Sequence, residues 1–116
     1  MAVKVNKDAV KYAQDLIEKG DYVVDTDWSE AQPSTEDEND FAEKEGWETY
    51  GKWHLGLDTD YDKDEKSRYE FPYGDFKKVH RKGVIAAKQR AGQNDYSDIK
   101  AAADELLQKI DDKEGK

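Results

Sequence analysis

Aromatic side chains must supply much of the core of this protein, because aliphatic side chains are scarce. Val, Ile, Leu and Phe together make up 19 of the 116 residues, and the formal net charge is −9. A chain this poor in branched apolar residues and this highly charged approaches the composition of disordered proteins. Three Trp and seven Tyr shift the balance, since each buried aromatic ring removes about 150–250 Å² from water. The composition therefore predicts one small domain with an aromatic-rich core under a charged surface.

The expected compartment follows from what the sequence lacks. There is no cysteine, which fits a reducing environment. No apolar run approaches the roughly 20 residues of a membrane-spanning helix, and the N-terminus has no apolar signal-peptide segment. We therefore expect a cytoplasmic protein that makes no membrane contact and is a monomer.

Helical periodicity covers most of the chain. Asn6 is a good N-cap for the first helix, and Gly20 follows its last turn. Ser34 with Asp37, or Thr35 with Glu38, has the spacing of a capping box at the start of the second helix. Asp75 is the expected N-cap of a later helix. The predicted helices cover residues 7–19, 35–45, 47–55, 76–91 and 97–111, where 35–45 and 47–55 are either two helices or one kinked helix.

These segments predict a mainly α fold. A single helical domain of four or five helices is expected over residues 6–111, and its last two helices should pack as an antiparallel hairpin. Residues 1–5 are expected to be a flexible N-terminus and residues 112–116 a disordered tail. One alternative remains open, which is a short two-stranded β element formed by residues 22–28 and 68–73.

Charge is divided between two blocks of the sequence. Residues 25–65 contain 15 acidic residues and three lysines, whereas residues 75–92 contain six basic residues and one acidic residue. On a helix over residues 76–91 the basic side chains can contact phosphates, and Tyr73 can stack on a base. The acidic block would repel a polyanion. Pairing of the two blocks within the fold, or plain solvation, is therefore the first interpretation, an acidic protein partner the second and nucleic acid the third.

His80 and Arg81 follow the aromatic stretch YEFPYGDF. Together they can form an anion pocket, or a general acid–base beside an electrophile. The structural alternative is a histidine whose ring bonds to a carboxylate or a backbone group while it covers the core. The candidate binding residues from both interpretations are Lys77, Lys78, His80, Arg81, Lys82 and Tyr73.

No metal site or cofactor is expected. His54 and His80 are the only histidines, and no second His or Cys lies at ligand spacing. Residues 57–67 form an acidic loop in which every second residue from Asp58 to Asp64 is Asp. The loop has neither the Gly at position 6 nor the Glu at position 12 of an EF-hand, so it is interpreted as a solvated loop.

Trp47, Tyr50 and Trp53 recur at every third position. This spacing places the three rings on one face of a helical turn. They can form a platform for a ligand, but in a chain so poor in aliphatic residues they are expected to form the core.

Four stretches of the sequence carry a resemblance to known proteins: WSEAQPSTEDENDF, WETYGKWHLG, RYEFPYGDFKKVHRKGVIAAKQRAGQ and DIKAAADELL. Together they resemble a family of short bacterial proteins to which no activity is assigned. The second half also resembles segments of phage- or prophage-associated proteins, which share an aromatic-x-Tyr/Phe-Pro-x-Gly pattern followed by a Val-His/Tyr-Arg helix. The resemblance covers residues 5–110 and implies no site residues.

The leading functional hypothesis is a non-catalytic interaction or accessory module, related to phage or prophage, with a protein rather than a nucleic acid as partner. Its basis is the separation of charge and the lack of a recognisable catalytic motif, and enzymatic activity is not expected. The first alternative is a nucleic-acid-binding module that uses the basic helix 76–91. The second is a small anion-binding or enzymatic site around His80 and Arg81.

Overall fold

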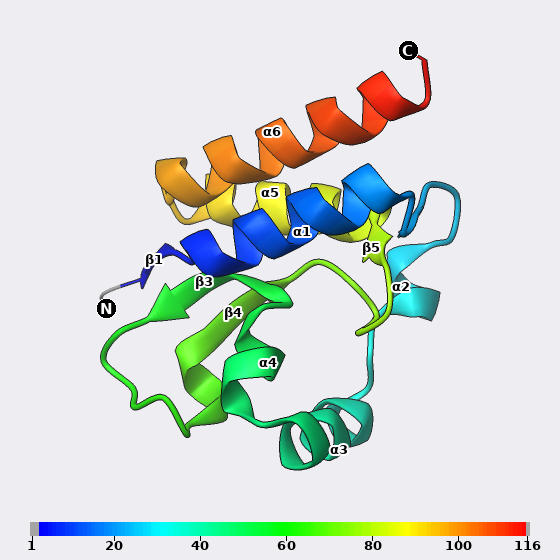
Figure 1. Cartoon of the computed structure of the whole chain (residues 1–116). Coiled ribbons are helices and arrows are strands. Elements are labelled where there is room, and N and C mark those ends of the chain that lie inside the picture. The colour runs from blue at the N-terminus through cyan, green and yellow to red at the C-terminus, as the bar shows by residue number, and fades with distance from the viewer. Residues whose placement is uncertain (1–2, 116) are drawn as a thin grey trace.

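A three-stranded antiparallel sheet lies beneath a layer of helices in the computed structural model, which describes residues 3–115 (Figure 1). Its strands lie in the order β1-β3-β4. A second sheet consists of two parallel strands, β2 and β5. The strands are β1 (Val3–Val5), β2 (Tyr22–Val23), β3 (His54–Asp58), β4 (Tyr69–Pro72) and β5 (Val79–His80).

Residues 3–115 also contain six α-helices and one 3-10 helix. They are α1 (Lys7–Lys19), α2 (Trp28–Ala31), α3 (Thr35–Glu45), α4 (Trp47–Gly51), η1 (Lys66–Arg68), α5 (Arg81–Gln93) and α6 (Ser97–Lys113). In Figure 1, α1, α5 and α6 lie on one side of the sheet, α4 lies on the other, and α3 is at the end far from α6. Helices α5 and α6 pack as the predicted antiparallel hairpin.

Local capping signals gave the correct starts and ends of several helices. The side chain of Asn6 accepts a hydrogen bond from the amide of Ala9 and caps α1. Gly20 ends that helix in the left-handed region, with φ of 86°. Ser34 and Asp37 form the predicted reciprocal capping box of α3. These predictions succeeded because each depends on residues within one helical turn.

The architecture is helix-rich but mixed α/β, so the prediction of a mainly α fold was only partly right. The largest error concerns residues 47–55, which were expected to be one helix. Helix α4 ends at Gly51, and His54 begins β3. Strand β3 is central, with β1 on one side and β4 on the other. Hydrogen bonds to two distant segments therefore override the local helical spacing.

The predicted two-stranded β element does not form as expected. Residues 22–28 contain β2 and residues 68–73 contain β4, but the two strands do not pair with each other. Strand β2 pairs in parallel with β5, and β4 pairs antiparallel with β3. Sequence alternation identified extended segments, but it carries no information about their partners.

The helix predicted over residues 76–91 begins later, at Arg81. Asp75 does bond to the amides of Lys77 and Lys78, as an N-cap would. However, Phe76 has φ of 69°, which is incompatible with an α-helix. Residues 74–78 therefore form a turn that leads into β5.

Both ends of the described chain form more secondary structure than predicted. Val3–Val5, part of the expected flexible N-terminus, pairs with β3. Helix α6 extends to Lys113, into the expected tail, and Glu114 accepts a hydrogen bond from the Tyr22 hydroxyl at 2.6 Å. Residues 1, 2 and 116 lie outside the described part of the chain. No helix within residues 3–115 is long and apolar enough to cross a membrane.

The largest side chains of the core are rings, as the composition predicted, although aliphatic residues are more numerous in it. The largest fully buried side chains begin with Trp53, Tyr50, Tyr73 and Phe71. Gly56 of β3 allows the close approach of the Phe71 ring, because a Cβ at this position would lie 2.7 Å from that ring. Ile99 of α6 approaches the same position from the helical layer, at 3.1 Å.

Replacing Gly56 with alanine should therefore destabilise the protein. Overpacking of a tight core costs about 1–3 kcal/mol, which urea unfolding measures directly. Gly92→Ala is the matched control, because its Cβ would meet nothing closer than Lys100 at 3.7 Å. Removing a helical glycine should leave stability unchanged or raise it by up to about 1 kcal/mol. Equal unfolding midpoints for the two variants would contradict the packing described for Gly56.

Candidate functional site

The six candidate binding residues do not form one surface. Lys77 and Lys78 lie in the turn before β5, His80 ends β5, Arg81 and Lys82 begin α5, and Tyr73 follows β4. Two of the side chains are buried, those of Tyr73 and His80. The lysines of the turn are exposed, and the side chains of Arg81 and Lys82 are partly exposed.

Tyr73 belongs to the core and cannot stack on a base, which corrects its predicted role. Its exposed fraction is 0%, and its ring packs against Trp53 at a centroid distance of 5.7 Å. Its hydroxyl donates to the carbonyl of Lys52 at 2.7 Å. Burial raises the pKa of the hydroxyl well above its usual value, so Tyr73 stays neutral.

His80 is held by Asp75, across the turn. Nε2 of His80 lies 2.9 Å from Oδ2 of Asp75. Because a carboxylate only accepts, Nε2 carries the proton in this bond. The other ring nitrogen, Nδ1, is buried and is the single side-chain polar atom of residues 3–115 found buried without a partner. This arrangement matches the structural alternative, a histidine that bonds to a carboxylate while it covers the core.

The carboxylate of Asp75 organises the whole turn. Its Oδ1 accepts from the amide of Lys77 at 3.0 Å and from that of Lys78 at 2.8 Å. Partial burial would raise its pKa, but hydrogen bonds from His80 and from the two amides outweigh this effect and lower the pKa. Asp75 is therefore ionised, and it fixes the backbone that holds Phe76 at positive φ.

Trp28 of α2 closes the space around His80. The two rings lie 6.0 Å apart between centroids. Trp28 also covers Gly83, where a Cβ would lie 2.8 Å from its ring and 2.8 Å from the carbonyl oxygen of Tyr73. Since the ring of His80 packs against Trp28 and is almost fully buried, a ligand has no direct path to it in this conformation.

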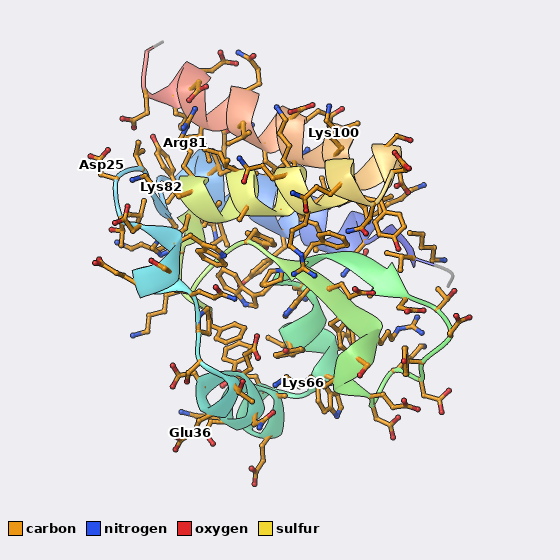
Figure 2. All side chains as sticks on the ribbon, turned by 180° about the vertical axis from the view of Figure 1, so that it is seen from behind. Asp25, Glu36, Lys66, Arg81, Lys82 and Lys100 are labelled. Carbon is orange, nitrogen blue, oxygen red and sulfur yellow. The ribbon has the colours of Figure 1, made fainter. Side chains whose placement is uncertain are left out.

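Arg81 points towards α6 (Figure 2). Its Nε lies 3.0 Å from Oδ1 of Asp111, and its Nη2 lies 3.3 Å from Oδ2. This bidentate geometry is the strong form of an arginine–carboxylate contact. His80 and Arg81 therefore bind different carboxylates on different elements, and they do not converge on one anion pocket.

Two further basic residues of α5 also have internal partners. Lys82 pairs with Asp27 at 3.0 Å, and Lys88 pairs with Asp104 at 2.7 Å. Charge pairing within the fold was the first interpretation of the basic block, and these contacts agree with it. The partner is different from the one expected, since only Asp27 belongs to the acidic block 25–65 and the other carboxylates lie on α6.

A groove on the opposite side of the turn was not predicted. It lies between the α2–α3 segment and the turn, and its volume is about 630 Å³. Phe41 and Phe76 stack within it at a centroid distance of 4.2 Å, with their planes 7° apart. The side chains that line the groove are those of Glu30, Ala31, Gln32, Pro33, Asp37, Asp40, Phe41, Lys44, Asp75, Phe76 and Lys77.

Sequence reasoning could have found part of this groove. Phe41 is the single large apolar residue of α3, and Phe76 follows a Gly-Asp turn. Phe41 is visible as an isolated ring in a polar stretch, and Phe76 as the last ring of the aromatic stretch YEFPYGDF. Their meeting depends on the positive φ of Phe76, which no sequence pattern indicates for a bulky residue.

Trp47, Tyr50 and Trp53, the aromatic residues at every third position, differ in their burial. Tyr50 and Trp53 are buried, which agrees with their interpretation as core. Trp47 is half-buried and stacks on Tyr69 at 6.0 Å, with the planes 6° apart. The pair lines a smaller cleft of about 370 Å³, in which Asn6 is satisfied by two backbone carbonyls.

The acidic loop 57–67 is fixed at its start rather than organised around an ion. Asp58 is buried, and its Oδ1 accepts from the amide of Asp60 at 3.0 Å. Within residues 3–115, no group of three or more His, Cys, Asp or Glu side chains is arranged to hold a metal ion.

His54 is the second buried histidine, and it starts the central strand β3. Its Nδ1 donates to the carbonyl of Tyr50 at 2.9 Å. Burial lowers the pKa of His54 from 6.5 to about 4, although the hydrogen bond to Tyr50 opposes this change. The ring is therefore neutral at neutral pH.

Comparison with known proteins returned no match to a family model, to a curated protein or to a solved structure. Function must therefore be inferred from the geometry of the side chains themselves.

His54 makes the stability of the protein depend on pH. Below pH 6.5 the unfolded chain binds a proton at this position that the folded protein does not bind until about pH 4. The stability that the neutral ring of His54 contributes is therefore fully present above pH 6.5, and it is lost as the pH falls towards 4. The slope in this window approaches about 1.4 kcal/mol per pH unit.

In the variant His54→Asn, the amide nitrogen can keep the bond to Tyr50 without titrating. The difference in free energy of unfolding between the two proteins should shrink as the pH falls through the window, and urea unfolding at a series of pH values measures it. Parallel pH profiles for the variant and the original protein would show that His54 is not held neutral by burial.

Proposed function

We propose that this protein is a non-catalytic interaction module that binds a protein partner. The contact surface is the groove between the α2–α3 segment and the turn at residues 74–78. The observation that supports this proposal is the stacked pair Phe41 and Phe76, which keeps apolar ring surface partly exposed in an otherwise highly charged end of the molecule. Apolar surface in a concave, polar-rimmed site is typical of binding grooves.

The basic helix is less suited to this role. Arg81, Lys82 and Lys88 each pair with a carboxylate of the same chain, so a polyanion would have to displace these partners. Lys77 and Lys78 are exposed in the turn and have no carboxylate partner among residues 3–115. Two lysines are few beside the six to ten phosphate contacts that give nucleic-acid binding its steep salt dependence.

The catalytic alternative has less support as well. His80 and Asp75 form the kind of pair that general bases use. The ring of His80 is only 4% exposed, and Arg81 is engaged by Asp111. An acid–base role would need Trp28 to move and a second group to enter, so we do not propose one.

A phage or prophage accessory role is part of the same proposal. The stretch that resembles phage-associated segments, from Tyr69 to Arg81, coincides with β4, the turn, β5 and the start of α5. It therefore includes Asp75, Phe76 and Lys77, the residues that line one wall of the groove. A cytoplasmic location fits such a role.

Site-specific photocrosslinking in the native host tests this proposal. A crosslinking amino acid at Gln32 lies on the rim of the groove, and one at Gln89 lies on the exposed part of the basic helix α5. Both positions are solvent-exposed glutamines, so the two variants are matched. We expect one discrete protein adduct from Gln32 and none from Gln89.

Adducts from Gln89 alone would contradict the choice of the groove and favour the basic helix. Lys77→Glu combined with Lys78→Glu then separates the remaining alternatives, because this change leaves the ion pairs of Arg81 and Lys82 intact. A gel shift at low salt that this double variant abolishes would establish nucleic-acid binding in place of the proposed function.

A further inference from the structure

We infer that the groove binds a basic polypeptide segment that inserts one aromatic or branched aliphatic side chain between flanking lysines or arginines. This inference rests on the proposed function and adds the chemistry of the partner.

The size of the groove fits one anchoring side chain and its neighbouring backbone. Its volume of about 630 Å³ lies within the range of about 300–1,000 Å³ that is typical of small-ligand clefts. One wall is the segment from Glu30 to Pro33, the second is α3, and the third is the turn that carries Asp75 and Phe76. Figure 1 shows α3 set apart from the layer of α1, α5 and α6, so the groove lies on the side away from the main helical layer.

The apolar part of the groove is held in place. Phe76 contacts Phe41 on one side and Trp53 of the core on the other, at centroid distances of 4.2 and 6.1 Å. Its positive φ is an uncommon conformation for a bulky residue, and it persists only when surrounding contacts enforce it. Here the contacts come from Asp75. Helix α3 is also fixed, since Lys66 of η1 pairs with Glu38 at 3.0 Å. An anchoring side chain would therefore enter a preformed site, which reduces the entropy cost of binding.

The charge around the groove favours a basic partner. Four carboxylates line it, those of Glu30, Asp37, Asp40 and Asp75, against the two lysines Lys44 and Lys77. Helix α3 as a whole has six acidic residues and one lysine. Figure 2 shows Glu36 on the outer side of this helix, away from α5. A second copy of the chain, with its net charge of −9, or a polyanion would be repelled from this end.

Glu30 and Asp40 are the residues best placed to pair with incoming cations. Both are exposed and line the groove, and within residues 3–115 neither side chain makes a hydrogen bond or ion pair. The other two carboxylates already have internal roles, because Asp37 caps α3 and Asp75 holds the turn. Removing the charges of Glu30 and Asp40 should therefore affect binding without affecting the fold.

The test is a titration of the labelled protein with synthetic peptides, followed by amide NMR shifts. The probe is acetyl-Lys-Lys-Phe-Lys-Lys-amide. One comparison peptide has Gly in place of Phe, and another has Glu in place of every Lys. The inference predicts saturable shifts around Gln32, Phe41 and Phe76 with the first peptide, several-fold weaker binding without the Phe, and no binding of the acidic peptide.

Two charge-matched variants show whether the groove is responsible. Glu30→Gln combined with Asp40→Asn should weaken the affinity for the first peptide on the order of tenfold, as expected for two exposed charge contacts. Asp62→Asn combined with Asp64→Asn removes the same charge from the acidic loop, where both side chains are exposed. Because salt screens charges beyond about 8 Å at physiological ionic strength, this control should bind as the original protein does.

Equal loss of affinity in both variants, or shifts spread over the acidic loop, would show non-specific charge attraction and overturn the inference. Concentration-dependent shifts of the same amides without peptide would identify a second copy as the occupant, and would also overturn it. A protein crosslink at Gln32 together with no response to the basic peptide would reject the basic partner while leaving the proposed function in place.

Discussion

The packing of aromatic rings around Trp53 is the interaction on which the rest of the structure depends. The ring of Trp53 contacts that of Tyr12 in the helical layer at a centroid distance of 5.4 Å. It also contacts the ring of Tyr73, the residue that follows β4, at a centroid distance of 5.7 Å. On its other side it contacts Phe76 of the turn, which stacks on Phe41 of the acidic helix α3. One continuous series of rings thus joins the three-helix layer to the acidic end of the molecule. Helix α3 has Ala42 as its one buried residue, and Phe41 is its single large apolar side chain. Without the rings, α3 would lose most of its attachment.

The same packing explains why the basic block does not act as a single surface. Forming β5 draws His80 into the interior, where Asp75 satisfies one ring nitrogen. Starting α5 at Arg81 then directs that side chain to Asp111 on α6. A run of adjacent cations in the sequence becomes a set of separate contacts, because consecutive residues at the junction of a strand and a helix point in different directions. The surface of the turn that is available to a partner is therefore the opposite one, where the rings of Phe76 and Phe41 line the groove.

The parts of the structure that could be predicted from the sequence are those encoded within one or two helical turns. Asn6 and Gly20 bound α1, and the Ser34 capping box starts α3, because the relevant groups lie within a few residues of each other. The strands are two to five residues long, too short for alternation to identify them, and their pairing joins distant segments. The groove was also beyond prediction, because it requires a positive φ at Phe76 and contact between residues on separate elements. The enclosed His80 was one of two interpretations considered, and geometry was needed to choose between them.

The most direct measurement is the solvent exposure of Trp53 in a protein that has no other tryptophan. Trp28 and Trp47 are only half-buried, so the variant with both replaced by phenylalanine should fold and report on Trp53 alone, which is 2% exposed. The account predicts fluorescence at short wavelength that acrylamide quenches little, and a shift to long wavelength only in the cooperative unfolding transition. Long-wavelength emission with strong quenching in native buffer, from a variant whose circular dichroism shows it to be folded, would contradict the central role of the aromatic core.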